Sequence, residues 1–275
     1  GSHSLDDNIT GDFNVAVGTN ALKANNGGSN CAIGVEALFS NTTGQYNTAV
    51  GINALRVSNA NSNVAVGEGS QFSTTSGESN TSIGTQTLYF NTTGDNNSAL
   101  GRSAGVFNIS GSNITNFANC SYIGFGSRAS GSNQVQLGDA STTAYAYGSV
   151  QNRSDQRDKT DIRDTLLGLS FINALRPVDF RWDYREDYYD LDEVNKTMTP
   201  VTKDGSRKGT RFHHGFIAQE VKEVSDSQGI DFAGYQDHSI NGGEDVLSIG
   251  YTELIGPLVK AVQELSARVQ ELENA

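Results

Sequence analysis

Large apolar side chains are scarce in this sequence, as are several residues that usually help to build a globular core. Apolar residues make up 36% of the 275 positions, and there are three prolines, one methionine and one tryptophan. This composition does not favour one thick core, although the length allows one large or two ordinary domains. No apolar run approaches the roughly 20 residues of a membrane helix, so no membrane insertion is expected.

Positive charge is also scarce. The chain has 19 Lys and Arg against 31 Asp and Glu, a formal net charge of −12. Binding to phosphates needs clustered Lys and Arg, so the charge argues against a nucleic acid partner. The first 153 residues hold 5 basic and 8 acidic residues, whereas the remainder holds 14 and 23. We therefore expect a boundary near residue 150, with one domain at 5–150 and a second at 151–275.

Cysteine occurs only at Cys31 and Cys120, which are far apart and in different sequence surroundings. The spacing suits neither a disulfide framework nor a zinc site, so we interpret both as buried free thiols. We expect no metal and no cofactor.

What is abundant is a repeated phrase: Asn, three small or aliphatic residues, then Gly. Six in-register copies argue against a disordered, low-complexity tract. A Leu follows four residues after most of the glycines, with Gln71 and Gly105 there in two copies. The glycines are 16 or 17 residues apart, and the copies begin at Asn14, Asn30, Asn47, Asn63, Asn80 and Asn97.

The physical interpretation is a coil repeated along an axis. Each copy supplies a short strand whose alternate residues, such as Val15 and Val17, point the same way. Its Gly permits a tight corner, and its Asn can hydrogen-bond backbone in its own coil or in a ladder with neighbouring coils. One coil cannot bury its apolar face, but stacked coils share a continuous core.

The phrase resembles the head repeats of trimeric autotransporter adhesins over residues 11 to about 105. The resemblance implies a β-roll or β-helix wound by three chains. Weaker phrases at Ile123-Gly124 and Leu137-Gly138 indicate an irregular continuation to about residue 140.

The sequence changes character after Gly148. We expect a helix opening at Ser154, a strand at 180–182, a polar loop at 186–209, and a strand running into a helix at 213–221. The chain ends in a helix with an a/d heptad seam, which requires partner helices; the heptad alone allows two or three strands. The seam residues are Leu258, Val262, Leu265, Val269 and Leu272.

Three motifs in this half resemble the intramolecular chaperone of phage tailspikes and tail fibres, the peptidase S74 type. The resemblance implies a mainly β trimeric fibre followed by an α+β chaperone domain that ends in a trimeric coiled coil. It also implies self-cleavage at Arg153–Ser154, with Ser154 as nucleophile and Lys159 as base. The motifs contain Ser154, Asp155, Arg157 and Lys159, then His214, Gly215 and Gln219 with their neighbours, and finally the 258–265 helix.

Elementary chemistry is compatible with this assignment. A serine hydroxyl needs an adjacent base to attack a carbonyl, and a lysine can serve when burial favours its neutral form. His213 or His214 is either an orienting or proton-donating group or a structural histidine on a strand. Asp158 beside Lys159 is expected to favour the ammonium form and so to slow cleavage.

Three functions remain open on the sequence. The first is an assembly chaperone on a viral fibre, made in the host cytoplasm, cleaving itself once and leaving a homotrimeric virion fibre that binds a glycan or protein receptor on the host cell. The second is a non-cleaving adhesin with a permanent trimerisation cap. A polysaccharide-degrading tailspike is disfavoured, because the repeats contain few acids and no close acidic pair of the kind that glycosidases use.

Overall fold

In a computed structural model of the chain, residues 1–192, 197–241 and 243–275 are described. They form two compact units. The first contains residues 1–144 together with 184–204 and 241–244, and the second contains 145–183, 205–240 and 245–275.

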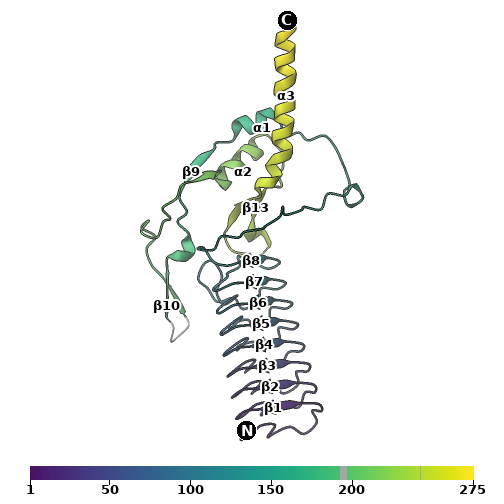
Figure 1. The fold of residues 1–275 in the computed structure, drawn as a ribbon, viewed down its shortest axis with the longest axis vertical. Helices are drawn as coiled ribbons and strands as arrows, with labels where there is room; N and C mark the ends of the chain where they lie inside the picture. The colour runs from purple at the N-terminus through teal and green to yellow at the C-terminus, as the bar shows by residue number, and fades with distance from the viewer. Residues whose placement is uncertain (193–196, 242) are drawn as a thin grey trace. The chain divides into compact units, whose positions relative to one another are not determined.

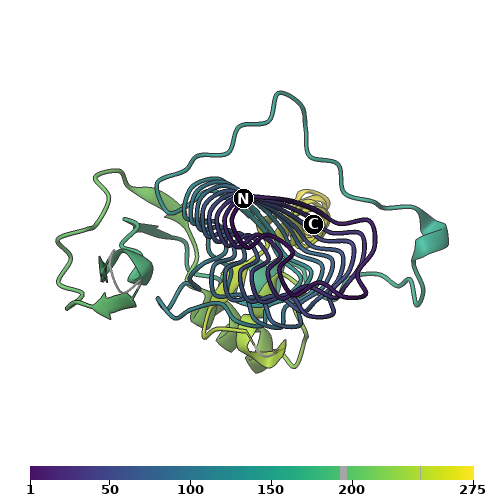
Figure 2. The ribbon, with the colours of Figure 1, turned by 90° about the horizontal axis from the view of Figure 1, so that it is seen from below.

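The first unit is a β-solenoid, as the repeats predict (Figure 1). Each repeat forms one coil, and its three-residue strand pairs in parallel with the strand of the next coil. Viewed along the stack, successive coils superimpose (Figure 2). Each coil is closed by one chain, in place of the expected winding of three chains around each other. The strands are β1 (Val15–Val17), β2 (Cys31–Ile33), β3 (Thr48–Val50), β4 (Val64–Val66), β5 (Thr81–Ile83), β6 (Ser98–Leu100), β7 (Ser121–Ile123) and β8 (Val135–Leu137).

In β2 to β6 the small central residue of the strand lies inside the coil. Ala32, Ala49 and Ala65 are fully buried, whereas the aliphatic residues on either side of each strand centre are partly buried or exposed. The interior is narrow, so alanine from the strand and leucine from the following turn fill it. The shared core expected from the repeats is therefore present, and the Val and Ile residues lie outside it.

A buried asparagine ladder joins the coils. From the second coil to the seventh, the residue at the position of the repeated Asn donates its backbone N–H to Oδ1 of the Asn one coil earlier, over 2.9–3.0 Å. The Nδ2 groups donate to a carbonyl in the following turn; for Asn63 this is Gly77, at 2.9 Å. These bonds satisfy polar groups that would otherwise be buried without partners, so the ladder form of the prediction is confirmed.

The phrase glycines and the leucines that follow them occupy left-handed or related conformations. Gly34 has φ of 142°, and a Cβ there would lie 2.4 Å from the carbonyl oxygen of Gly51, so only glycine fits. Leu38 has φ of 51° although it is not glycine, and its side chain is fully buried. Burial in the shared core offsets the backbone strain at this position.

The two repeats that lack this leucine are compensated by neighbouring residues. Gln71 is fully buried and donates through Nε2 to Ser82 Oγ at 2.9 Å, where other coils have alanine. Gly105 leaves room for Tyr122, which replaces another central alanine; a Cβ on Gly105 would lie 3.0 Å from the Tyr122 ring. Each departure from leucine is therefore matched by a second departure at the central alanine of a neighbouring strand.

The described residues of 184–204 pack with the solenoid in the first unit. The prediction of a polar loop over 186–209 is wrong in part. The chain instead forms a hairpin of β10 (Tyr189–Asp192) and β11 (Thr197–Pro200), which pair in antiparallel register. A single turn of 3-10 helix at Arg185–Asp187 leads into it, and Tyr188 is buried.

The second unit is α+β. Its core contains Phe171, Leu175, Val221, Phe232 and Leu254. No helix among the described residues is long and apolar enough to cross a membrane. The elements are α1 (Leu169–Ala174), β9 (Val178–Phe180), β12 (His213–Gly215), α2 (Ala218–Ser227), β13 (Tyr235–Asp237), β14 (Leu247–Ile249) and α3 (Ile255–Glu273), with β9 pairing β12 and β13 pairing β14.

Helix α3 also organises the start of α1. Glu264 Oε2 accepts a hydrogen bond from the backbone N–H of Leu169 at 2.8 Å, which satisfies an otherwise free donor at the helix end. The strand-to-helix prediction for 213–221 and the terminal helix are both confirmed.

Candidate functional site

Ser154 and Lys159 lie on either side of one short turn. The expected helix opening at Ser154 is wrong: the segment makes a single 3-10 turn at Gln156–Asp158, and α1 begins only at Leu169. Asp155 caps the turn by accepting from the backbone N–H of Arg157 at 2.9 Å. Because the turn is so short, the residues before and after it can meet.

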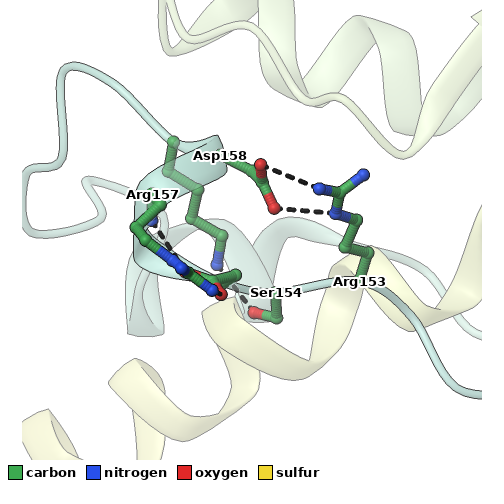
Figure 3. A network of polar contacts seen from close by, with 6 residues as sticks. Arg153, Ser154, Arg157 and Asp158 are labelled. Carbon is green, nitrogen blue, oxygen red and sulfur yellow. Dashed lines mark hydrogen bonds and ion pairs between the residues drawn. The ribbon is translucent and has the colours of Figure 1, made fainter.

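The two side chains do meet. Lys159 Nζ lies 2.7 Å from Ser154 Oγ, within hydrogen-bond distance (Figure 3). This is the separation that a base needs to take a proton from a hydroxyl. In the ammonium form Lys159 donates to the serine; in the neutral form the same nitrogen can accept the serine proton.

The charged residues next to Ser154 and Lys159 form two ion pairs. Asp158 binds Arg153 through both carboxylate oxygens, at 2.7 and 3.0 Å (Figure 3). The expected pairing of Asp158 with Lys159 is thus replaced by a clamp on the residue before Ser154. Asp155 binds the Arg157 guanidinium at 2.6 Å, and these hydrogen bonds lower the pKa of the Asp155 carboxyl and raise the pKa of Arg157.

The whole segment around this pair is in contact with water. Every residue from 141 to 166 is exposed, including Ser154 and Lys159. Among the residues that the structure describes, none covers the pair, and water favours the charged form of a lysine. The geometry for proton transfer is present, while the described residues do not supply the burial that would activate the base.

Two residues of the second motif, His214 and Gln219, have surroundings of their own and are not recorded in contact with Ser154 or Lys159. His214 Nδ1 lies 2.6 Å from Asp179 Oδ1, its neighbour across the β9–β12 pair, and both side chains are exposed. Gln219 is exposed in the first turn of α2. The bonding of His214 to Asp179 supports the structural interpretation of this histidine.

Gly215 has a packing role that the motif alone does not reveal. A Cβ on it would lie 2.2 Å from the Tyr251 hydroxyl, and that hydroxyl accepts from the backbone N–H of Phe216 at 3.3 Å. Tyr251 therefore fixes the passage from β12 towards α2. Sequence reasoning missed this tyrosine, because it lies outside all three motifs.

Comparison with known families supports the motif assignment. Residues 154–230 match the family model described as chaperone of endosialidase, the peptidase S74 family. The matched region begins at Ser154 and includes Lys159, His214, Gly215 and Gln219. No curated protein and no solved structure matches the chain.

Proposed function

We propose, from the chaperone-of-endosialidase match at residues 154–230, that this chain is the C-terminal part of a phage tail fibre or tailspike. Its second domain assembles three copies of the chain and then cuts the Arg153–Ser154 bond. The finished fibre belongs to the virion and binds a glycan or protein receptor on the host cell. The observation that carries the assembly role is a pair of exposed apolar stripes, one in each unit.

The stripe on the solenoid is an uninterrupted column of aliphatic side chains. The third residue of every strand contributes to it, and six of the eight are between 41% and 55% exposed. Water-exposed apolar patches of this extent usually mark an interface. The column consists of Val17, Ile33, Val50, Val66, Ile83, Leu100, Ile123 and Leu137.

The second stripe is the heptad seam of α3. Its five residues are 45–79% exposed although they follow the a/d spacing of a coiled coil. A second and a third copy of the chain would cover both stripes at once, since each copy offers the same two surfaces. Three copies are proposed because the family resemblance implies a trimer.

Cleavage would follow directly from the contact between Ser154 and Lys159. Neutral Lys159 takes the serine proton, and Oγ attacks the carbonyl carbon of Arg153. The peptide C–N bond breaks as Lys159 passes that proton to the departing nitrogen, which frees the Ser154 amine and leaves an ester between Arg153 and Oγ. Water then hydrolyses the ester, releasing the shaft with a new carboxylate at Arg153.

Exposure of the pair couples this chemistry to assembly. Lys159 works as a base only after losing its proton, and desolvation promotes that loss. In the trimer, a neighbouring copy would cover the 141–166 segment and exclude water from the pair. The cut would then follow assembly.

A denaturing gel with N-terminal sequencing tests the proposal. We expect two fragments, the smaller beginning at Ser154, from a protein that is trimeric before denaturation. The second candidate, a permanent non-cleaving cap on an adhesin, is favoured by the Asp158 clamp on Arg153 and by the exposed base. It predicts a single band near 29.3 kDa from an equally trimeric protein.

A further inference from the structure

The sixth coil of the solenoid is larger than the others. Its phrase glycine, Gly101, is 23 residues from Gly124, whereas the other spacings in the regular array are 16 or 17. The extra residues form an ordered turn centred on Asn108. Its Oδ1 accepts from the backbone N–H groups of Ser110 and Ser112, at 3.1 and 2.8 Å.

Hairpin β10–β11 packs directly on this insertion. A Cβ added to Gly111 would lie 2.6 Å from a ring atom of Tyr189, so the ring rests against the glycine backbone. Farther along the hairpin, Leu191 lines a small pocket with Phe90 and Phe107 of the solenoid. The hairpin therefore fits a surface formed by the enlarged coil together with Phe90 of the coil before it.

Two further contacts anchor the same region. Arg128 Nη1, from the next coil, donates to the backbone carbonyl of Glu186 at 3.3 Å. Glu244, which follows the hairpin by some 40 residues in the sequence, makes the second contact. Its carboxylate accepts a hydrogen bond from Asn108 Nδ2, and its backbone N–H donates to the carbonyl of Ser130. Asn108 thus shapes the inserted turn and binds a second segment as well.

Both docked segments come from the chaperone half of the sequence. Residues 184–204 lie inside the family match, and 241–244 follow it, yet both pack with the solenoid as part of the first unit. The repeats alone do not require an insertion, because the other coils stack without one. The inserted residues are instead the ones that contact these two segments, through Asn108 and Gly111.

We propose that the enlarged sixth coil, residues 105–114, is the docking site through which the chaperone half holds the shaft during assembly. The partner is hairpin β10–β11 with the 3-10 turn that precedes it, together with Glu244 of this chain. Docking would order the last three coils of the solenoid first. The earlier coils would then stack on coils that are already folded. This inference rests on the proposed chaperone function and specifies which part of the shaft it acts on.

Gly111→Ala tests the site, and Gly126→Ala is its matched control. Both glycines have positive φ, at 76° and 59°, so both substitutions strain the backbone; a Cβ meets Tyr189 at the first position and nothing within 4 Å at the second. We would measure hydrogen–deuterium exchange of residues 186–192 and the trimer yield, using the full chain with Ser154→Ala to prevent cleavage.

We expect Gly111→Ala to raise exchange in the hairpin at least tenfold and to lower the trimer yield, while Gly126→Ala leaves both close to the parent. Tyr189→Ala combined with Gly111→Ala should restore part of the yield, because it removes the clash. Equal losses in both glycine variants, or an unprotected hairpin in the parent, would overturn the docking site.

The outcomes separate this inference from the proposed function. A trimeric parent whose yield is unchanged by Gly111→Ala, despite a released hairpin, contradicts docking as an assembly contact and leaves the chaperone role intact. A parent that never forms trimers contradicts the chaperone role itself, whatever the hairpin does.

Discussion

The solenoid and the cleavage segment satisfy their polar groups in opposite ways. In the solenoid each coil bonds to the next, and the ladder asparagines from Asn30 to Asn97 are at most 1% exposed. In the segment 141–166 every residue is exposed, and its ion pairs lie in water, where each contributes little stability. The first region is ordered by its own repeats. The second has no such order of its own, and in the proposed function other copies of the chain cover it.

The largest expected effect is on the cut. Ser154→Ala and Lys159→Ala should each abolish cleavage and leave the trimer intact, and the double variant should be no worse than either, since the two groups act as one unit. Lys159→Arg is the sharper control. It keeps a positive donor beside Ser154, but arginine does not deprotonate, so it should also be inactive. Denaturing gels over several days would measure this; cleavage in Ser154→Ala refutes the assignment.

Assembly should fail when charge enters the aliphatic column. Leu100→Asp would bury an unpaired carboxylate in the trimer interface, which costs several kcal/mol per chain. We expect monomers or aggregates by light scattering. Thr93→Asp places the same charge at an exposed turn of the preceding repeat, and it should remain trimeric. A trimeric Leu100→Asp variant would show that the column faces solvent in the assembly.

Breaking one rung of the ladder should have an intermediate effect. Asn63→Ala leaves the buried N–H of Asn80 and the carbonyl of Gly77 without partners, at a cost of about 2–5 kcal/mol. The exposed Asn116→Ala is the control and should change stability little. Thermal unfolding of the uncleaved trimer would measure both. Equal melting temperatures would mean that the ladder is not a stabilising element.

The smallest expected effect is a pH dependence of hairpin docking. Burial raises the pKa of Glu186, and Asp187 and Asp139 act in the same direction, while Arg128 and Arg185 oppose them. A raised pKa means that the docked state favours the protonated acid. Docking should therefore strengthen as pH falls from 7 and reach its full gain below about 4.3, the ordinary glutamate value.

Exchange protection of residues 186–192, corrected for the intrinsic rate at each pH, would detect this change. Glu186→Gln should remove it and keep the hairpin docked at neutral pH. Protection that rises with pH in the parent would contradict the sign of the effect.

The sequence predicted the repeat because spacing alone determines where one coil ends and the next begins. It did not reveal which strand face is inside, since alternation defines two faces but only the narrow interior selects Ala32 over Ile33. The hairpin at 189–200 was missed because its residues are mostly polar and rely on contacts with distant coils. At the candidate site, the pairing of Ser154 with Lys159 was expected from the family resemblance, but a helix was assigned where one turn suffices.

Native mass spectrometry of the Ser154→Ala protein tests the central claim most directly. The account predicts a stable species of three times the 29.3 kDa chain mass, with no fragment after denaturation. The unsubstituted protein should form the same trimer and then denature into two fragments that join at Arg153–Ser154. A stable, folded monomer from the Ser154→Ala protein would contradict the assembly role.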